Sequence, residues 1–171
     1  MRKSLILVLL LIASLKVSAQ EINWVSFEEA IKLNKKTPKK ILIDVYTDWC
    51  GWCKKMDKET YTNKKIAALI NKEFYAVKLN AEQKKAITYK GKVFKFIPNG
   101  RRGSHQLAAE LLRGKMSYPS TIFLSEDEGV LDRIPGYQKP DIMEKIVVFI
   151  GKEIYTNTSW EEFEKNFKSN L

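Results

Sequence analysis

Cysteine and histidine are both scarce in this sequence, and their scarcity excludes several kinds of protein. The chain of 171 residues has two cysteines and one histidine. Small secreted domains that depend on disulfides use several bridges between distant cysteines, whereas Cys50 and Cys53 lie only three positions apart. A bridge between them closes almost no loop and removes little entropy from the unfolded chain. A closed zinc site of four Cys and His ligands also lacks its donors. Chemical reactivity is therefore the better explanation for this pair.

The N-terminal apolar run is too short for a membrane-spanning helix. It extends from Leu5 to Ala13, well below the roughly 20 apolar residues that such a helix needs. Arg2 and Lys3 precede this run, and the small residues Val17-Ser18-Ala19 follow it. A basic start, an apolar middle and small residues at the end are typical of a secretory signal peptide. We therefore expect cleavage after Ala19 and a periplasmic or secreted protein.

Removal of residues 1–19 leaves 152 residues, and residues 20–171 then suit one domain with a single core. The formal charge of +10 becomes +7 without Arg2, Lys3 and Lys16. The remaining basic residues are interpreted as scattered among acids, which is typical of a solvated surface. Nucleic acid is not an expected partner of an exported chain, although acidic proteins or an anionic membrane surface would be attracted. We expect a monomer.

Apolar periodicity predicts a mixed α/β fold. Runs of β-branched and aromatic residues predict strands, and apolar residues at i, i+3 and i+4 predict helices. Strands are expected at 41–46, 74–79, 121–124 and 130–134, and helices from Ser26 to Pro38, at 50–58, at 63–72, from Pro140, and after Thr158 or Ser159. The last two strands flank a polar, Gly-bearing turn and predict a hairpin. This order predicts crossover helices on a central sheet that ends in an antiparallel pair. Residues 81–117 are interpreted as a loop-rich insertion that holds one helix, at 106–113.

The two cysteines lie where a predicted strand passes into a predicted helix, in the segment Trp49-Cys50-Gly51-Trp52-Cys53. Cys50 is thus expected at the helix N-terminus, where unpaired backbone N–H groups and the helix dipole favour a thiolate. Cys53 lies one turn further along, so we expect it to be less exposed and to act as the resolving thiol. The spacing suits disulfide exchange, in which Cys50 attacks a substrate disulfide and Cys53 releases the product. The redox-active disulfide would be the only redox group, and neither a cofactor nor a metal is expected.

The segment from Ile41 to Lys54 resembles the active-site strand and helix of the thioredoxin family. Asp44 stands six positions before Cys50, where thioredoxins carry a buried acid, and Lys78-Leu79-Asn80 resembles the strand that supplies the lysine neighbour of that acid. The resemblance therefore implies that Asp44 is paired with Lys78 and accepts the proton of the second cysteine. A buried carboxylate without a full set of partners has a raised pKa, which suits that role.

The same resemblance extends over residues 26–151. Tyr118-Pro119-Ser120-Thr121 is similar to the cis-proline loop that faces the sulfurs, which implies that the backbone of Tyr118 is free to bond a substrate strand. Trp49 and Trp52 are expected to form the apolar rim where a protein substrate docks. His105 lies in a Gly-rich basic loop and is interpreted as a surface residue. The stretch from Cys53 to Thr60 is closest to exported members, among them the periplasmic C-terminal domain of the transmembrane thiol-disulfide interchange reductase.

The expected function is a protein-disulfide oxidoreductase that keeps exported proteins reduced, supplied by a membrane or soluble electron donor. Thioredoxins usually have Gly-Pro between the cysteines, and this chain has Gly51-Trp52, so the direction of electron flow stays open. A disulfide oxidase or isomerase would use the same residues at a different potential. A carrier of a soft metal such as Cu(I), or a non-catalytic module that binds a partner through the basic insertion, remain alternatives.

Overall fold

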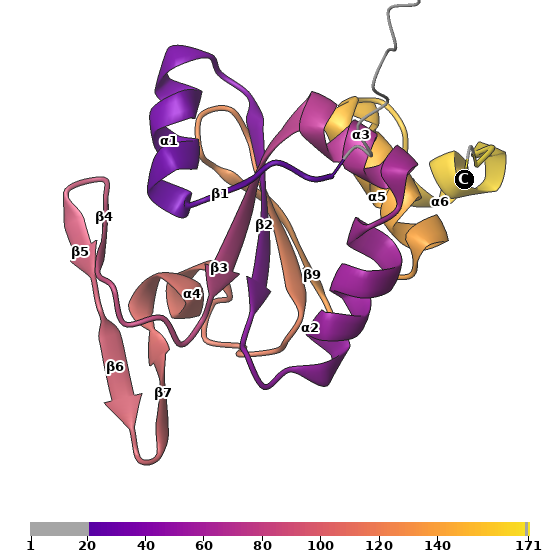
Figure 1. The fold of residues 1–171 in the computed structure, drawn as a ribbon. Helices are drawn as coiled ribbons and strands as arrows, with labels where there is room; N and C mark the ends of the chain where they lie inside the picture. The colour runs from indigo at the N-terminus through magenta and orange to yellow at the C-terminus, as the bar shows by residue number, and fades with distance from the viewer. Residues whose placement is uncertain (1–20, 170) are drawn as a thin grey trace, which may run out of the picture.

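A mixed five-stranded sheet with the order β1-β3-β2-β8-β9 forms the centre of the protein (Figure 1). The computed structural model describes residues 21–169 and 171, so the expected signal peptide lies outside the described residues. The first three strands of this order run parallel, and β8 and β9 are antiparallel to their neighbours. The strands are β1 (Trp24–Val25), β2 (Lys40–Tyr46), β3 (Phe74–Asn80), β8 (Ser120–Leu124) and β9 (Val130–Pro135). The predicted mixed sheet with its terminal antiparallel hairpin is confirmed.

Helices cover both faces of this sheet, as the periodicity predicts. They are α1 (Phe27–Lys36), α2 (Gly51–Met56), the π-helix η1 (Asp57–Tyr61), α3 (Lys64–Glu73), α4 (Gln106–Leu111), α5 (Pro140–Gly151), the 3-10 helix η2 (Ile154–Thr156) and α6 (Trp160–Asn166). The side chains of Ser26, Asn63 and Ser159 accept hydrogen bonds from backbone N–H groups in the first turns of α1, α3 and α6, which fixes where these helices begin. Within residues 21–169 and 171, no helix has both the length and the apolar character needed to cross a membrane.

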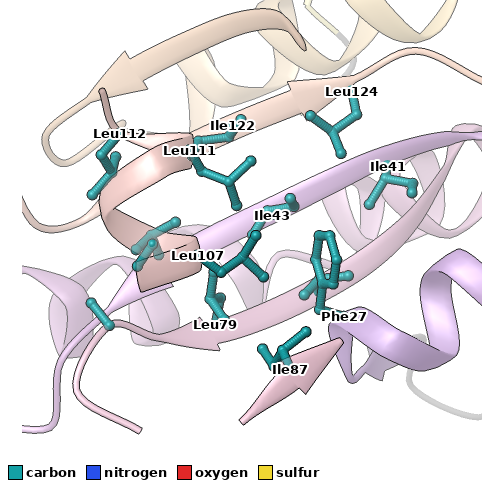
Figure 2. Close-up of a cluster of buried hydrophobic side chains, with 14 of the residues drawn as sticks. Phe27, Ile41, Ile43, Leu79, Ile87, Leu107, Leu111, Leu112, Ile122 and Leu124 are labelled. Atoms are coloured by element: carbon teal, nitrogen blue, oxygen red, sulfur yellow. The ribbon is translucent and has the colours of Figure 1, made fainter. Parts of the chain in front are cut away.

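Alternate residues of β2 point to opposite faces of the sheet and build two cores. Ile41, Ile43 and Val45 lie in the cluster that α1 and α4 cover, and Figure 2 shows this cluster with Phe27, Leu79 and the leucines of α4 packed around the strands. Leu42 lies in the other cluster, which includes buried residues of α2, η1, α3 and α5. Because it is buried on both faces, β2 can hold a functional group at a fixed position inside the protein.

Residues 81–117 contain two β-hairpins as well as a helix, so the interpretation as a loop-rich insertion with one helix was wrong. The hairpins are β4 (Ile87–Tyr89) with β5 (Lys92–Phe94), and β6 (Phe96–Asn99) with β7 (Arg102–His105). Lys90 and Gly91 both have positive φ, as a two-residue type I′ turn requires, and Gly100 has φ of 57° at the second turn. Strands of three or four residues are too short for a period of two to stand out in the sequence. The predicted helix is confirmed as α4.

His105 is buried, so its interpretation as a surface residue was also wrong. Its Nδ1 accepts a hydrogen bond from the Leu107 N–H at 3.3 Å, which caps α4, and its Nε2 lies 3.2 Å from the Lys85 carbonyl. The His105 N–H donates to the Ala81 carbonyl at 2.7 Å. Burial lowers the pKa of His105, which favours the neutral ring that both contacts need. This residue therefore ties the second hairpin to the start of the insertion.

The first strand, β1, is another difference from the sequence analysis, which predicts no strand before residue 41. Trp24 and Val25 instead pair in parallel with Ala76 and Val77 of β3. The two-residue strand gains its hydrogen bonds from β3, a partner about 50 residues away in the sequence, so local periodicity could not reveal it. As a result β3 is an interior strand rather than an edge strand.

Gly103 provides a test of the packing within the second hairpin. A Cβ added to this residue would lie 2.4 Å from both the Ile97 carbonyl oxygen and Phe96 Cζ. We expect Gly103→Ala to lower the free energy of unfolding by about 1–3 kcal/mol, because the backbone and the ring must move apart. Urea denaturation measures this loss. Gly51→Ala is the matched control, since nothing lies within 4 Å of its new Cβ; equal stability of the two variants would contradict this packing.

Candidate active site

The two cysteines form a disulfide at the point where β2 leads into α2. The S–S distance is 2.07 Å and the Cα–Cα distance is 5.3 Å. Cys50 occupies the N-cap position of α2, and its Sγ accepts a hydrogen bond from the Cys53 N–H at 3.1 Å. Such a bond stabilises negative charge on the sulfur of Cys50 when the disulfide is reduced. The helix start therefore favours Cys50 as the attacking thiolate.

Burial does not distinguish the two cysteines in this oxidised form, contrary to the sequence prediction. Cys50 is 4% exposed and Cys53 is 3% exposed. The covalent bond holds the sulfur of Cys50 against the first turn of α2, so both sulfurs share one environment. The expected difference in exposure is therefore absent from the oxidised state.

Asp44 lies in the middle of β2 and is 1% exposed. Its Oδ2 accepts a hydrogen bond from Lys78 Nζ at 2.7 Å, which is the pairing that the sequence predicts. Its Oδ1 is buried without a hydrogen-bond partner among residues 21–169 and 171. Burial raises the pKa of Asp44 to about 6, although the positive charge of Lys78 opposes this rise. The carboxyl group can therefore exchange a proton near neutral pH.

A second carboxylate, Asp57 of η1, also pairs with Lys78. The ammonium group lies 5.0 to 5.4 Å from three aromatic ring centroids, those of Trp24, Tyr46 and Tyr61. Burial disfavours the charged lysine, but the two carboxylates outweigh it and raise the pKa of Lys78. The lysine therefore stays protonated between a buried acid and an exposed one.

Asp57 was missed in the sequence analysis, although a signal for it exists. It stands four residues after Cys53, and residues four apart share one face of a helix. Its side chain is 45% exposed, and both it and Lys78 line a surface pocket of about 440 Å³. The ion pairs thus connect the interior carboxylate of Asp44 to solvent.

The cis-proline loop lies at the same end of the sheet as the disulfide. The Tyr118–Pro119 peptide bond is cis, and Ser120 begins β8 opposite Val45 near the end of β2. The Pro119 carbonyl accepts a hydrogen bond from the Gly136 N–H at 2.7 Å. Within the part of the chain that the structure describes, the backbone N–H and C=O of Tyr118 have no hydrogen-bond partner. An extended peptide could pair with them.

Aromatic side chains surround the disulfide on the surface. Trp49 is 51% exposed and Trp52 is 58% exposed, as expected for a rim rather than a core. The ring of Trp49 meets that of Tyr118 edge-on, with 6.0 Å between the ring centroids. The ring centroids of Trp52 and Tyr137 lie 5.7 Å apart. Lys55 Nζ lies above both rings of the second pair. Neither Tyr137 nor Lys55 was predicted: Tyr137 follows β9 and approaches Trp52 only through the packing of the fold, whereas Lys55 stands three residues after Trp52 on the same helix.

The family comparison identifies the domain to which this geometry belongs. Residues 27–151 match the family model of the thioredoxin-like domain. The chain belongs to the thioredoxin-like family. The matched range agrees with the extent of the resemblance that the sequence motifs indicate, and it includes both hairpins of the insertion.

Individual relatives are distant. An uncharacterized protein of Caenorhabditis elegans is 25% identical over 150 residues, which cover 86% of this thioredoxin-like chain and 18% of that protein. This chain thus spans less than a fifth of that relative's length. Two solved structures share the fold: a DsbH oxidoreductase (18% identity, TM-score 0.55, covering 81% of this chain and 90% of that one) and a thioredoxin from Thermus thermophilus (14% identity, TM-score 0.57, covering 87% and 99%).

The raised pKa of Asp44 leads to a prediction about stability. Between pH 3.8 and about 6 the folded thioredoxin-like domain retains a proton that the unfolded chain releases, so Asp44 lowers the stability as pH rises through this window. The two pKa values differ by an amount that corresponds to about 3 kcal/mol. We expect Asp44→Asn to exceed the wild type in free energy of unfolding by up to about 3 kcal/mol above pH 7 and by little at pH 4.

Urea denaturation of the oxidised proteins at pH 4, 5.5 and 7.5 measures this difference. Asp132→Asn is the matched control, because Asp132 is an exposed carboxylate on β9 of the same sheet. If the difference in free energy of unfolding between Asp44→Asn and the wild type stays constant with pH, the buried charge of Asp44 is not its cause.

Proposed function

We propose that this thioredoxin-like protein is a thiol-disulfide oxidoreductase that acts on disulfides of polypeptides. The observation that carries the proposal is the Cys50–Cys53 bond at the start of α2, with the Cys53 N–H directed at the sulfur of Cys50. Two cysteines three positions apart that form a disulfide at a helix start can alternate between dithiol and disulfide. The protein thereby transfers two electrons for each disulfide exchanged.

In the reductive direction, the reaction begins from the dithiol. The thiolate of Cys50 attacks one sulfur of the substrate disulfide, and the substrate S–S bond breaks as a mixed disulfide forms. The departing substrate sulfur leaves as a thiolate and takes a proton from solvent. Hydrogen bonding from the helix start supports the anionic form of Cys50 before this attack.

Cys53 then completes the exchange. Its thiol loses a proton and attacks Cys50 Sγ, which re-forms the intramolecular disulfide and releases the second substrate thiolate. Asp44 is the proton acceptor, because it lies on the face of β2 that α2 covers and its raised pKa of about 6 suits proton transfer near neutral pH. The ion pairs of Lys78 with Asp44 and Asp57 give the proton a route to solvent.

Substrate binding uses the surface around the disulfide. The unpaired backbone groups of Tyr118 can hydrogen-bond an extended substrate segment. Trp49 and Trp52 offer exposed apolar area on either side of the reacting sulfurs. This arrangement favours a flexible polypeptide over a small thiol as substrate.

The proposed setting is an exported compartment, where the protein keeps substrates reduced with electrons from a membrane or soluble donor. Residues 1–19 have the pattern of a secretory signal peptide. In an oxidising compartment a disulfide reductase is itself oxidised in each turnover, so it needs an electron donor that returns the Cys50–Cys53 pair to the dithiol.

The reduction potential of the Cys50–Cys53 pair tests the direction of electron flow. We expect a potential near or below about −270 mV, the value of a reducing thioredoxin. Thiol trapping of the mature protein in graded dithiothreitol or glutathione buffers measures it. A potential above about −180 mV would instead indicate an oxidase or isomerase, and failure to form any reversible disulfide would contradict the proposal.

Single cysteine replacements test the order of the two sulfurs. We expect Cys53→Ser to accumulate a mixed disulfide with a substrate peptide, because the attacking thiol remains and the resolving thiol is gone. Cys50→Ser should give neither adduct nor turnover. Non-reducing gel electrophoresis and mass spectrometry after mixing with an oxidised peptide detect the adduct. A stable adduct on Cys53 in the Cys50→Ser protein would reverse the assignment.

The same variants distinguish the alternatives. A module that binds a partner without exchange would retain its partner after Cys50→Ser. A Cu(I) carrier would bind the metal through both sulfurs and lose it in either single variant. Among the described residues, no cluster of three or more His, Cys, Asp or Glu side chains could hold a metal ion, so a Cu(I) ion would depend on the two sulfurs.

A further inference from the structure

We infer that the β6–β7 hairpin, residues 96–105, is a docking arm that selects polypeptide substrates with acidic residues close to their disulfide. We call this hairpin the basic arm, because Arg101 lies in its turn and Arg102 begins β7. The inference rests on the proposed function and adds a substrate class to it.

The excess positive charge of the domain is concentrated in the insertion. Residues 81–117 have nine basic residues and only two acidic ones, Glu82 and Glu110, a net charge of +7. The remaining described residues, at 21–80 and from 118 onward, have 18 basic and 18 acidic residues. The sequence analysis interpreted the basic residues as scattered, and this distribution corrects that interpretation.

Several cations of the insertion are already paired, and those of the basic arm are not. Three lysines form ion pairs with carboxylates: Lys85 with Glu28 at 3.3 Å, Lys90 with Glu128 at 3.3 Å and Lys92 with Glu110 at 2.7 Å. Arg101 and Arg102 are exposed and form no ion pair with any carboxylate of residues 21–169 or 171. Their charges are available to a partner.

Arg102 carries this charge to the active site. Its guanidinium carbon lies 4.3 Å from the centroid of the Trp49 ring. Trp49 directly precedes Cys50, and the same ring contacts Tyr118 of the cis-proline loop. A substrate segment that pairs with Tyr118 and reaches Cys50 would therefore pass beside the guanidinium group. A contact of this kind is a cation–π interaction and orients the arginine over the ring.

The basic arm is held in place rather than left as a free loop. The buried ring of His105 ties its end to Lys85 and caps α4, and the Phe96 ring packs directly over Gly103. Figure 1 shows the hairpin projecting from the body of the protein on the same lower side as the connection from β2 to α2. Ile97 on this hairpin is 48% exposed and adds apolar contact area.

The chemistry of the basic arm indicates its occupant. A guanidinium group pairs with a carboxylate through two parallel hydrogen bonds, which suits Asp or Glu side chains of a peptide. An anionic membrane would also attract arginines, but their placement on the tryptophan beside the disulfide favours a partner that itself brings a disulfide to Cys50. We therefore assign the surface to acidic polypeptides.

Three peptides with one intramolecular disulfide and identical sequences, except for Asp, Ser or Lys at the positions that flank the cysteines, test the inference. The readout is the ratio of second-order rate constants for their reduction by the dithiol form of the mature protein. We expect the Asp peptide to react about tenfold faster than the Lys peptide at low salt. In about 1 M NaCl the ratio should approach one, because the Debye length falls to about 3 Å.

Charge reversal of the basic arm, Arg101→Glu with Arg102→Glu, should bring the ratio below one. The ratio is taken within each variant, so a general change in reactivity cancels. Lys35→Glu with Lys36→Glu is the matched control: it makes the same change of charge on two exposed residues at the end of α1, by the start of β2 and away from Cys50. This control should retain the preference for the Asp peptide.

Equal rate constants for the Asp and Lys peptides in the wild-type protein would overturn the inference. An equal loss of the preference for the Asp peptide in the Lys35→Glu, Lys36→Glu control would also overturn it, because the preference would then arise from the net charge of the whole protein. Binding to vesicles with anionic phospholipid that depends on Arg101 and Arg102, together with a ratio of one, would assign the arm to a membrane instead. Reduction of the uncharged 2-hydroxyethyl disulfide by the wild type tests the proposed function separately. If this disulfide is not reduced, the proposed oxidoreductase activity itself is contradicted.

Discussion

The carboxyl group of Asp44, enclosed within the central strand, is the constraint on which the arrangement of the site depends. A charge at that depth is unfavourable without a partner, and Lys78 on the neighbouring strand supplies one at 2.7 Å. The lysine is in turn held by Asp57 and by three aromatic rings from β1, β2 and η1. Four elements thus meet around one buried acid. The charge of Lys78 offsets only part of the effect of burial, so the pKa of Asp44 is raised to about 6. The carboxylate whose burial is unfavourable is therefore the group suited to accept a proton.

The domain combines two parts with different charge. The sheet and its flanking helices hold the disulfide, the buried acid and the cis-proline loop, and they are electrically balanced over the described residues. The insertion at 81–117 carries the net charge of +7 and brings an arginine to the ring of Trp49. The proposed reactivity therefore resides in the sheet and α2, whereas the proposed choice of partner resides in the hairpins, away from the sulfurs. This separation is common where a rigid scaffold presents loops to a ligand.

Most of the sheet could be predicted from its apolar pattern, and the pairing of Asp44 with Lys78 could be predicted only from the resemblance to the thioredoxin family. The run 41–46 is apolar and β-branched, and the cysteines follow it directly, so a strand that feeds a helix start was the natural interpretation. The features that escaped prediction involve short or distant partners. β1 has two residues and exists only because β3 pairs with it, and the hairpins of the insertion have strands of three and four residues. His105 seemed to belong to a basic loop, and its burial follows from contacts with Ala81 and Lys85.

The amino-acid sequence establishes which reactive groups are present and how they are spaced: two cysteines three positions apart after a predicted strand, an acid six positions before Cys50, and a Tyr-Pro step before a later predicted strand. Periodicity and helix capping indicate where the cysteines lie, whereas the expected roles of Asp44 and Pro119 follow from the family resemblance. The three-dimensional fold adds that Asp57 completes the ion-pair chain, that Tyr137 lies beside Trp52, and that Arg102 lies on Trp49. Each of these contacts joins residues from different parts of the fold, so it depends on how the elements pack rather than on any local pattern.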